Sequence, residues 1–554
     1  MTVLLFEDFR SKLLAALTRA IPNLDGKDLL LDTSGHGDFT LRLFRLMKDM
    51  NSTPGDIYNL ALNALSAEDY IGGAELAASY INFTIKPEKM FSAVTDSISA
   101  RGQYPDIFQD PDRILVEHTS ANPTGPLHVG RVRGSIIGDS LARLLTRYGY
   151  RVSTQYYIND SGKQMIALYE GFLRYGQNNM TPESLLKGYQ EIYRAMESDK
   201  SIGEDLEKLI QAYEKGDRAI IMKIREIASV MLQNIRDSLQ QLDIKIDDYV
   251  WESDFLMGGD VDNVVHELSE HLQDDDGAKF IVTDDGSRVF LKRKDGTSLY
   301  FARDIAYHLF KSLNFDWFID VLGEAHKDHG KNLGYVLKKL LDLNQKLDFL
   351  YYGFVSLETG KMSTRMGQIV SLWDLISRTE EEALSIVTAK RQDLSPEKLK
   401  EISRNVARSS IRFNIIRVNP VKTMVFKWNE ALNFEGDSAP YIMYSYTRAS
   451  SILEKSGDTI INDFMFTDDH EKKLVRSLYT YPYYLEEATK SLRSDIISSY
   501  ILGLVKSFND FYSQCPVLNA PEVDRNRRIA LVKIYRDILD DACKIIGIKN
   551  VDEM

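Results

Sequence analysis

The central part of the chain alternates short apolar runs with stretches of helical spacing. Such alternation is typical of a parallel sheet whose strands are joined by helices. The runs that predict strands lie at residues 114–116, 152–158, 289–291, 317–322 and 350–355. A helical pattern over residues 132–148 separates the first two of these runs. We therefore predict a Rossmann-type catalytic domain with a parallel sheet over residues 106–380.

The pattern changes on both sides of this domain and once within it. Residues 1–105 combine helical spacing at 6–17 and 40–47 with a strand-like run at 80–85, which predicts a small α/β N-terminal domain. Glu, Lys, Leu and Ile recur at helical spacing over about residues 165–250, which predicts a helical insertion between two halves of the sheet. Strand signals end near residue 380, so we expect a helical stem over 381–435 and an all-helical domain over 436–554.

Length and composition agree with a multidomain α/β protein. A chain of 554 residues, 44% hydrophobic and 27% charged, is expected to form several globular domains. No apolar run approaches the roughly 18–20 residues of a membrane-spanning helix, so no membrane partner is expected. Cys515 and Cys543 are too few for a disulfide framework or a structural zinc site, which favours the cytoplasm and predicts no metal site. The net charge of −13 argues weakly against a broad nucleic-acid-binding surface, and it is compatible with a local basic surface that binds nucleic acid.

The clearest chemical signal is the sequence VEHTSANPTGPLHVGR at residues 116–131. A strand leads through a polar turn into the first turn of a helix, whose unpaired N–H groups and dipole favour an anion. His128 and Arg131 add side-chain donors at the same place. The alternative is that His128 is a histidine without function in a strand-to-helix turn. The surrounding Asn, Pro and Gly residues argue against this alternative.

A second polar loop carries the sequence GKMSTRMG at residues 360–367. A basic surface loop would explain it without any function. The functional hypothesis is a loop in which Lys361 and Arg365 neutralise phosphate charge during nucleotide chemistry, since such reactions depend chiefly on placed positive charge.

Both loops resemble signatures of class I aminoacyl-tRNA synthetases, in the form found in arginyl-tRNA synthetases. Residues 128–131 resemble the HIGH signature, with Arg131 where the general pattern has a second His. Residues 361–364 resemble the KMSK loop, with Thr364 in place of the last Lys and Arg365 beside it. The resemblance implies that the catalytic residues are His128, Arg131, Lys361 and Arg365. It implies ATP contacts from His128, Gly130, Arg131, Gly323, Glu324, His326, Lys361, Met362 and Ser363.

A pocket for arginine needs a carboxylate, because a planar guanidinium pairs best with two oxygens. Glu117 lies at a strand end, where open α/β sheets bind ligands, and Asn122 follows in the loop. Tyr300 and Asp304 share one face of a predicted helix, although an ordinary amphipathic helix is the alternative. The resemblance implies an arginine site made of Glu117, Ser120, Asn122, His128, Tyr300, Asp304 and His326.

Aromatic and arginine residues are interspersed through the predicted C-terminal domain. Such a mixture suits stacking of unpaired bases, although aromatic residues at helical spacing are more often core. The region resembles the anticodon-binding domain of the same family, and residues 1–105 resemble the additional domain that touches the tRNA elbow. The tRNA contacts that this implies are Asn82, Tyr441, Tyr444, Arg448, Arg527 and Arg528.

The expected function is activation of L-arginine with ATP and Mg²⁺, followed by transfer to the 3′ end of an arginine tRNA, by a monomeric enzyme. Two alternatives remain open at this point. A smaller nucleotidyl transferase of the same superfamily would not need the long helical C-terminal region. A non-catalytic RNA-binding paralogue would be expected to lose His128 or Lys361, and both are present.

Overall fold

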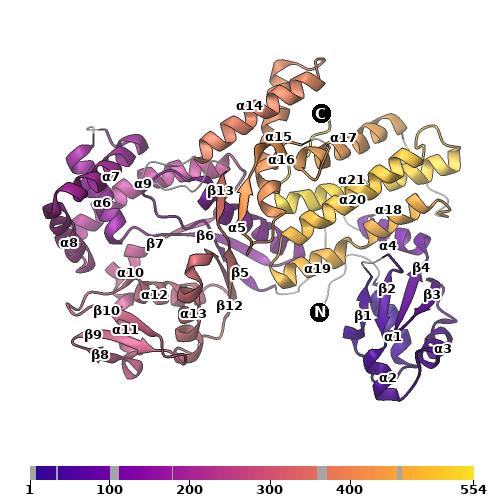
Figure 1. The fold of residues 1–554 in the computed structure, drawn as a ribbon, viewed down its shortest axis with the longest axis horizontal. Coiled ribbons are helices and arrows are strands. Elements are labelled where there is room, and N and C mark those ends of the chain that lie inside the picture. The colour runs from indigo at the N-terminus through magenta and orange to yellow at the C-terminus, as the bar shows by residue number, and fades with distance from the viewer. Residues whose placement is uncertain are drawn as a thin grey trace.

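The structure is a computed structural model that describes residues 8–32, 35–99, 111–176, 179–357, 371–433, 435–457 and 465–554 (Figure 1). Lys361, Met362, Ser363 and Arg365, which were predicted to contact ATP or to act in catalysis, lie outside the described residues. In the described part of the chain, no helix is long and apolar enough to cross a membrane.

A parallel sheet of five strands forms the centre of the catalytic domain. Its order is β12 (Lys346–Tyr352), β11 (Trp317–Gly323), β5 (Arg113–Glu117), β6 (Arg151–Ile158) and β7 (Asp248–Trp251). Every pair in this sheet is parallel, as the apolar runs predicted. The chain continues from β5 to one neighbour, β6, and reaches the other, β11, only much later. The carboxyl end of β5 is therefore a topological switch point, where such sheets bind ligands.

Helix α5 (Val129–Tyr148) packs on this sheet and begins at the end of the motif loop. It starts three residues before the predicted helix, because His128 has the extended backbone of an N-cap residue. Gly149, with φ 112°, ends the helix in the left-handed conformation that glycine tolerates best. Close approach of helix and sheet depends on Gly134 and Gly138, whose missing side chains leave room for Tyr352 and His118.

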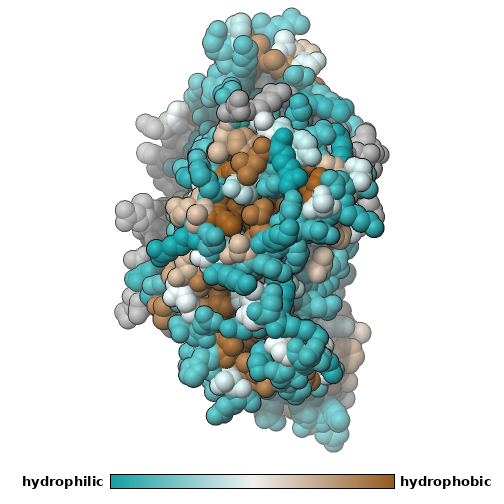
Figure 2. Space-filling view, turned by 90° about the vertical axis from the view of Figure 1, so that its left-hand side faces the viewer, coloured by the Kyte–Doolittle hydropathy of each residue, from teal (hydrophilic) through white to brown (hydrophobic). Residues whose placement is uncertain are grey.

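The predicted insertion lies between β6 and β7. Its helices are α6 (Gly162–Tyr175), α7 (Pro182–Ser198), α8 (Lys200–Glu214) and α9 (Arg218–Gln240), and they share a core of their own. The helices end at Gln240, and residues 248–251 return to the sheet as β7. Figure 2 shows the face to which the insertion contributes; it is mostly hydrophilic, with scattered apolar side chains. Leu173 and Met222 are among the exposed apolar residues of the insertion.

A second addition follows β7 and corrects one predicted strand. It contains α10 (Glu252–Gly258), α11 (Asp260–Glu267), β8 (Gln273–Asp275), β9 (Ala278–Val282) and β10 (Arg288–Lys292). The run at 289–291 is a strand, but it belongs to an antiparallel sheet of order β10-β9-β8 and not to the parallel sheet. Helix α12 (Tyr300–Ser312) then leads back to β11. Beyond β11 come a short 3₁₀ turn (Glu324–His326) and α13 (Lys327–Tyr335), which precedes β12.

The N-terminal domain is an antiparallel sheet with helices. The strand order is β1 (Leu29–Leu31), β2 (Phe39–Arg42), β4 (Tyr80–Ile85) and β3 (Ile71–Ala77). The helices are α1 (Phe9–Thr18), α2 (Phe44–Met50), α3 (Pro54–Leu65) and α4 (Pro87–Ser99). The helix predicted over 40–47 begins only at Phe44, because residues 39–42 pair with β1 and β4.

The described residues from 371 to the C-terminus form helices and one short strand. The helices are α14 (Leu372–Lys390), α15 (Pro396–Ile416), α16 (Trp428–Ala431), α17 (Ala439–Ser456), α18 (Asp469–Tyr479), α19 (Tyr481–Ser491), α20 (Asp495–Gln514) and α21 (Glu522–Ile546). The prediction of no strand after residue 380 is wrong at β14 (Met424–Phe426), which pairs in parallel with β13 (Val355–Leu357). In Figure 1 the N-terminal sheet lies below α18, at the end of the molecule opposite to the insertion.

Candidate active site

The loop after β5 has a strained backbone that is held from both sides. Thr119 and Ser120 have φ values of 73° and 31°, a region that residues with side chains seldom adopt. The hydroxyl of Ser120 donates to Glu117 at 2.7 Å and accepts the backbone N–H of Tyr157 at 3.1 Å. Tyr156 donates to the carbonyl of Ala121 at 2.5 Å. Strand β6 therefore fixes the turn that leads from Glu117 to the helix entrance.

His128 lies at the N-terminus of α5 with an unused ring nitrogen. Its Nδ1 is buried and has no hydrogen-bond partner among the described residues. Burial, together with the nearby charge of Arg131, lowers the pKa of His128 to about 4. The ring is therefore neutral near pH 7. A neutral imidazole beside unpaired helix N–H groups can hydrogen-bond a phosphate without adding a full charge.

Both described flanks of the segment that carries Lys361 lie beside this helix entrance. A Cβ placed on Gly130 would be 3.6 Å from the carbonyl oxygen of Val355. On the other flank, Ser371 forms an antiparallel bridge with His128, and Leu372 donates its N–H to the carbonyl of Leu127 at 2.7 Å. The two motif loops thus connect to one place in the fold, although more than 200 residues separate them in the sequence.

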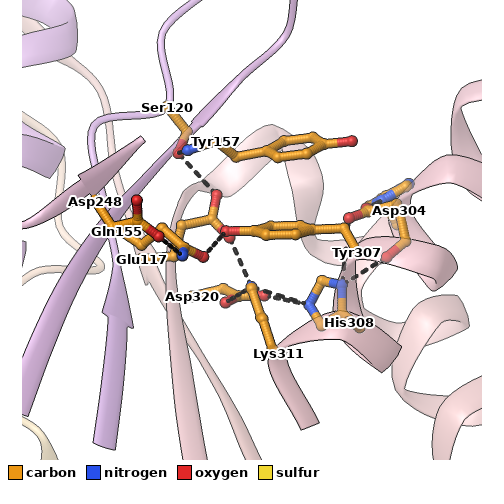
Figure 3. A network of polar contacts seen from close by, with 11 residues as sticks. Glu117, Ser120, Gln155, Tyr157, Asp248, Asp304, Tyr307, His308, Lys311 and Asp320 are labelled. Atoms are coloured by element: carbon orange, nitrogen blue, oxygen red, sulfur yellow. Dashed lines mark hydrogen bonds and ion pairs between the residues drawn. The ribbon is translucent and has the colours of Figure 1, made fainter. Parts of the chain in front are cut away.

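A buried network of charges occupies the space between the ends of β5 and β11 and helix α12 (Figure 3). Lys311 donates to Glu117 and to Asp320, each at 2.7 Å. His308 contacts Asp320 through Nε2 at 2.7 Å and the backbone carbonyl of Asp304 through Nδ1 at 2.8 Å. The sequence-based site contained only Glu117 and Asp304 of these residues.

Two signals in the sequence point to the missing members of this network. Asp320 interrupts the apolar run WFIDVL, where a carboxylate in a buried strand must find a partner. His308 continues the helix face of Tyr300 and Asp304 at four-residue spacing, and Lys311 lies one turn further. Neither signal names the partner strand, because sequence spacing does not show which strands adjoin.

Aromatic rings and a further histidine complete the surroundings of Asp304. Tyr157 and Tyr307 stack with ring centroids 4.2 Å apart, and Tyr307 donates to Gln155 at 2.6 Å. Nε2 of His329 lies 2.5 Å from the carboxylate of Asp304. The ring of Tyr300 stacks on His329 at 5.5 Å and is 60% exposed, so it covers this side of the site from outside.

Helix α12 is anchored by a second buried ion-pair cluster that sequence reasoning missed. Arg303 pairs with Glu214 of the insertion at 2.7 Å and also with Glu252 of α10. Arg303, Tyr300, Asn122 and Gln164 line part of a cavity of about 550 Å³. Asn122 donates its side-chain amide to Gln164 at 3.1 Å. Two predicted arginine-site residues, Asn122 and Tyr300, thus share one cavity wall.

The predicted nucleotide residues after β11 lie at the same carboxyl edge of the sheet. Gly323 ends the strand, and Glu324 and His326 form the short 3₁₀ turn that follows. Burial lowers the pKa of His326, which favours a neutral ring. Glu324 pairs with Lys327 at 3.0 Å on an exposed surface.

The predicted tRNA residues divide into exposed and buried positions. Tyr444 is 46% exposed, and the guanidinium of Arg448 lies 5.0 Å from its ring and 4.6 Å from that of Tyr512. Tyr441 is partly buried and accepts a hydrogen bond from Asn509 at 2.8 Å. Asn82 is buried in the N-terminal sheet and accepts the hydroxyl of Thr40 at 2.8 Å.

The two arginines of α21 do not lie where the sequence-based interpretation expected them. Arg527 is only 4% exposed and pairs with Glu471 at 3.3 Å and with Asp524 at 2.6 Å. Arg528 donates to the same Glu471 at 2.6 Å. Glu471 is fully buried, so it needs these cations as partners. The geometry places both guanidinium groups on an internal carboxylate, which opposes the expected phosphate contacts.

The parallel sheet, the His128 entrance and the flanks of the second loop define a class I aminoacyl-tRNA synthetase, and the comparisons agree. Residues 93–428 match the family described as "tRNA synthetases class I (R), catalytic domain". Residues 7–85 match "Arginyl tRNA synthetase N terminal domain", and residues 442–554 match "DALR anticodon binding domain". The chain belongs to the arginyl-tRNA synthetase family.

Similarity to individual proteins extends over the whole chain. The arginine–tRNA ligase of Thermoplasma acidophilum is 48% identical over 552 residues, which cover 100% of both chains. That of Archaeoglobus fulgidus is 36% identical over 96% of this chain and 97% of its own. The solved structure of Thermus thermophilus arginyl-tRNA synthetase superimposes with a TM-score of 0.85 at 25% identity, covering 99% of this chain and 100% of that one.

Proposed function

We propose that this chain activates L-arginine with ATP and transfers the arginyl group to the 3′ end of an arginine tRNA. The observation that carries the proposal is the pair of carboxylates, Glu117 and Asp304, which belong to one network at the carboxyl edge of the sheet; Glu117 is buried and Asp304 is partly buried. A guanidinium binds such a site well, whereas a neutral side chain leaves its charges unpaired. The neutral ring of His128 and the start of α5 supply a neighbouring phosphate site.

In the first step, the arginine carboxylate attacks the α-phosphorus of ATP and pyrophosphate leaves. His128 and the N–H groups of α5 hydrogen-bond the phosphates, and Arg131 adds positive charge. Lys361 and Arg365 are proposed to stabilise the transition state from the second loop. In the second step, the terminal ribose hydroxyl of the tRNA attacks the arginyl carbonyl, and AMP leaves.

Further parts of the proposal concern the bound nucleotide and the state of the enzyme. Mg²⁺ enters with ATP and neutralises phosphate charge. Gly323, Glu324 and His326 contact the nucleotide, and Ser120, Asn122, Tyr300 and His326 complete the arginine site. Met362 and Ser363 join Lys361 at the phosphates. The enzyme acts as a monomer in the cytoplasm, where its two buried thiols, Cys515 and Cys543, stay reduced.

ATP–pyrophosphate exchange with each of the twenty amino acids, with and without arginine tRNA, tests the function. Of the twenty amino acids, only arginine should support exchange, and it should do so only when arginine tRNA is present. Exchange that depends on another amino acid would contradict the proposed substrate. The variant Glu117→Gln should raise the KM for arginine far more than that for ATP, because the guanidinium loses a charged partner. Asp328→Asn, an exposed carboxylate nearby, is the matched control.

The variant Lys361→Ala tests the second loop. Its charge is proposed to act in the transition state, so kcat for adenylate formation should fall while the KM for arginine stays nearly constant. A rise in the KM for arginine at constant kcat would remove Lys361 from this role.

A further inference from the structure

Two carboxylates lie side by side on two adjacent strands of the parallel sheet. Glu117 of β5 and Asp320 of β11 are register partners on adjacent parallel strands. They are 6% and 2% exposed, so water reaches neither of them freely. Like charges at this separation in a buried site repel strongly unless a cation lies between them.

Lys311 is the cation between them, and it comes from a different element. Its side chain is fully buried, and its ammonium contacts Glu117 and Asp320 at equal distances of 2.7 Å. The ring of Tyr307 lies 4.3 Å from the same ammonium. These contacts raise the pKa of Lys311 in spite of its burial, so it stays charged. The ammonium thereby fixes one oxygen of Glu117, and Ser120 fixes the other.

His308 extends the network from Asp320 to Asp304. Its Nε2 faces a carboxylate oxygen of Asp320, and its Nδ1 faces the backbone carbonyl oxygen of Asp304. Both of these neighbours are hydrogen-bond acceptors at 2.7–2.8 Å, which favours a proton on each ring nitrogen, while the ammonium of Lys311 lies farther from Nε2, at 3.4 Å. The contacts with Asp304 and Asp320 raise the pKa of His308 to about 9, although burial and Lys311 oppose this rise.

The linked groups of this network include more carboxylates than cations. Glu117, Asp304 and Asp320 supply three carboxylates, and Lys311 and His308 supply two cations. His329 contacts the carboxylate of Asp304 from the other side. Among Glu117, Asp304, Asp320, Lys311 and His308, carboxylates outnumber cations by one, which equals the charge of one guanidinium.

We propose that Lys311, Asp320 and His308 are positioning residues that orient the carboxylates of the arginine site and set its net charge to suit one guanidinium. This inference rests on the proposed function, and none of the three residues needs to touch the substrate. This role differs from a packing role in one testable way. If charge matters, the loss of a cation should offset the loss of a carboxylate, whereas packing defects would add. Removal of one carboxylate should harm arginine recognition, and removal of a cation as well should restore the part of it that depends on charge.

The test compares Asp320→Asn with the double variant Lys311→Met and Asp320→Asn. Asp320→Asn keeps the shape but removes one negative charge, so we expect the KM for arginine to rise at least tenfold and the KM for ATP to stay within twofold. Selectivity for arginine over citrulline, its neutral isostere, should fall in the same variant. The double variant removes one charge of each sign, so its KM for arginine should fall below that of Asp320→Asn, to less than tenfold above that of the unmodified chain, although Glu117 has lost the ammonium that orients it.

The control is Asp139→Asn, which removes a buried carboxylate that pairs with Arg412 at 2.5 Å and does not belong to the network of Glu117, Lys311, Asp320, His308 and Asp304. It should lower the melting temperature and leave the KM for arginine unchanged. The inference is overturned if Asp320→Asn leaves that KM within twofold, or if the double variant binds arginine more weakly than Asp320→Asn. Should Asp320→Asn fail to fold, the double variant decides alone, and a tenfold rise in its KM would overturn the inference. Arginylation by the unmodified chain tests the proposed function separately.

Discussion

At the scale of single residues, the site combines groups whose protonation is set in opposite directions. His128 is held neutral by burial and by Arg131, while His308 is held protonated by acceptors on both of its nitrogens. The neutral ring lies at the N-terminus of α5, near Arg131, where we propose a phosphate site. The protonated ring lies among carboxylates. Environment, and not residue type, thus assigns the two histidines their chemistry.

The first prediction follows from the neutral state of His128. We expect kcat for arginylation not to fall as pH rises from 6 to 8, because the ring is deprotonated across that range. His128→Ala should lower kcat by about 10²–10³-fold, the usual effect of removing one transition-state hydrogen-bond donor. A tenfold loss of rate on raising the pH, absent in His128→Asn, would instead assign a protonated imidazole to the mechanism.

The second prediction concerns His118, which lies behind the motif loop. Burial lowers the pKa of His118 to about 4, and its Nε2 has no hydrogen-bond partner among the described residues. The unfolded chain, with a histidine pKa of about 6.5, therefore binds this proton before the folded chain does. Stability should decrease as pH falls from about 6.5 towards 4, by about 2 kcal/mol for this residue at pH 5.

Thermal unfolding of the unmodified chain and of His118→Phe, at pH 7.5 and 5.0, measures this effect. Phenylalanine fills nearly the same space and does not titrate, so the variant should lose less stability on acidification. His308 contributes with the opposite sign, since a raised pKa gives stability that is fully present below about pH 6.5 and is lost as pH rises from there through 9. Its contribution is common to both chains and cancels. Equal losses in the two chains would contradict the assignment of His118.

At the scale of elements, the motif works because α5 can approach β5 closely. A Cβ on Gly138 would lie 2.3 Å from the Cβ of His118, so the helix would have to move away from the strand. Strand β5 carries Glu117 and the start of α5 carries His128, so their distance depends on this packing. The insertion acts on the site in a similar way through Glu214, which holds Arg303 and hence the start of α12.

The third prediction is that Gly138→Ala destabilises the protein by about 1–3 kcal/mol, the usual cost of overpacking a close contact. Differential scanning calorimetry should show the loss as a lower melting temperature. Gly503→Ala is the matched control, because Gly503 lies inside α20 and an added Cβ there meets no atom within 4 Å. That change should be neutral or stabilising by up to about 1 kcal/mol, because alanine is the better helix former. A similar loss of stability in both variants would show that the close contact between α5 and β5 does not explain the effect of Gly138→Ala.

At the scale of the whole molecule, the helical domain connects the catalytic domain with the N-terminal domain. Arg476 of α18 pairs with Asp38 at 3.0 Å, and Tyr479 accepts the backbone N–H of Phe9 at 3.0 Å. On the other side, Arg147 of α5 pairs with Asp541 of α21 at 2.8 Å. The helical domain therefore contacts both the N-terminal domain and the catalytic domain.

The fourth prediction assigns anticodon binding to the exposed rings around Arg448. Tyr444→Ala and Tyr512→Ala should each raise the KM for arginine tRNA by about 5–150-fold, as expected for loss of a base stacked with 1–3 kcal/mol. The KM for arginine and for ATP should not change. Arg527→Ala should lower the melting temperature instead, because it leaves Glu471 buried without one of its partners. If the tyrosine variants bind tRNA normally, this surface is not the anticodon site.

The sequence by itself determined the class of fold and the position of the two motif loops, whose chemistry stays a prediction. Strand and helix periodicities are local properties, so the parallel strands near 114, 152, 317 and 350 were predictable, and so was α5 to within three residues. The residues of the motif at 116–131 were predictable for the same reason, because one strand, turn and helix carry them all. Family resemblance then identified the enzyme class, which the comparisons confirmed.

Only the tertiary structure decided which charged residues meet. Lys311, His308 and Asp320 join Glu117 because β11 lies beside β5, a pairing that no local pattern encodes. The same limit affected Arg527, whose partner Glu471 lies on another helix, and the run at 289–291, which has the periodicity of a strand but pairs in a separate sheet. The physical reason is that periodicity reflects the order of apolar and polar residues within one segment. Burial of a charged side chain depends instead on a partner that is distant in the sequence and close only in the fold.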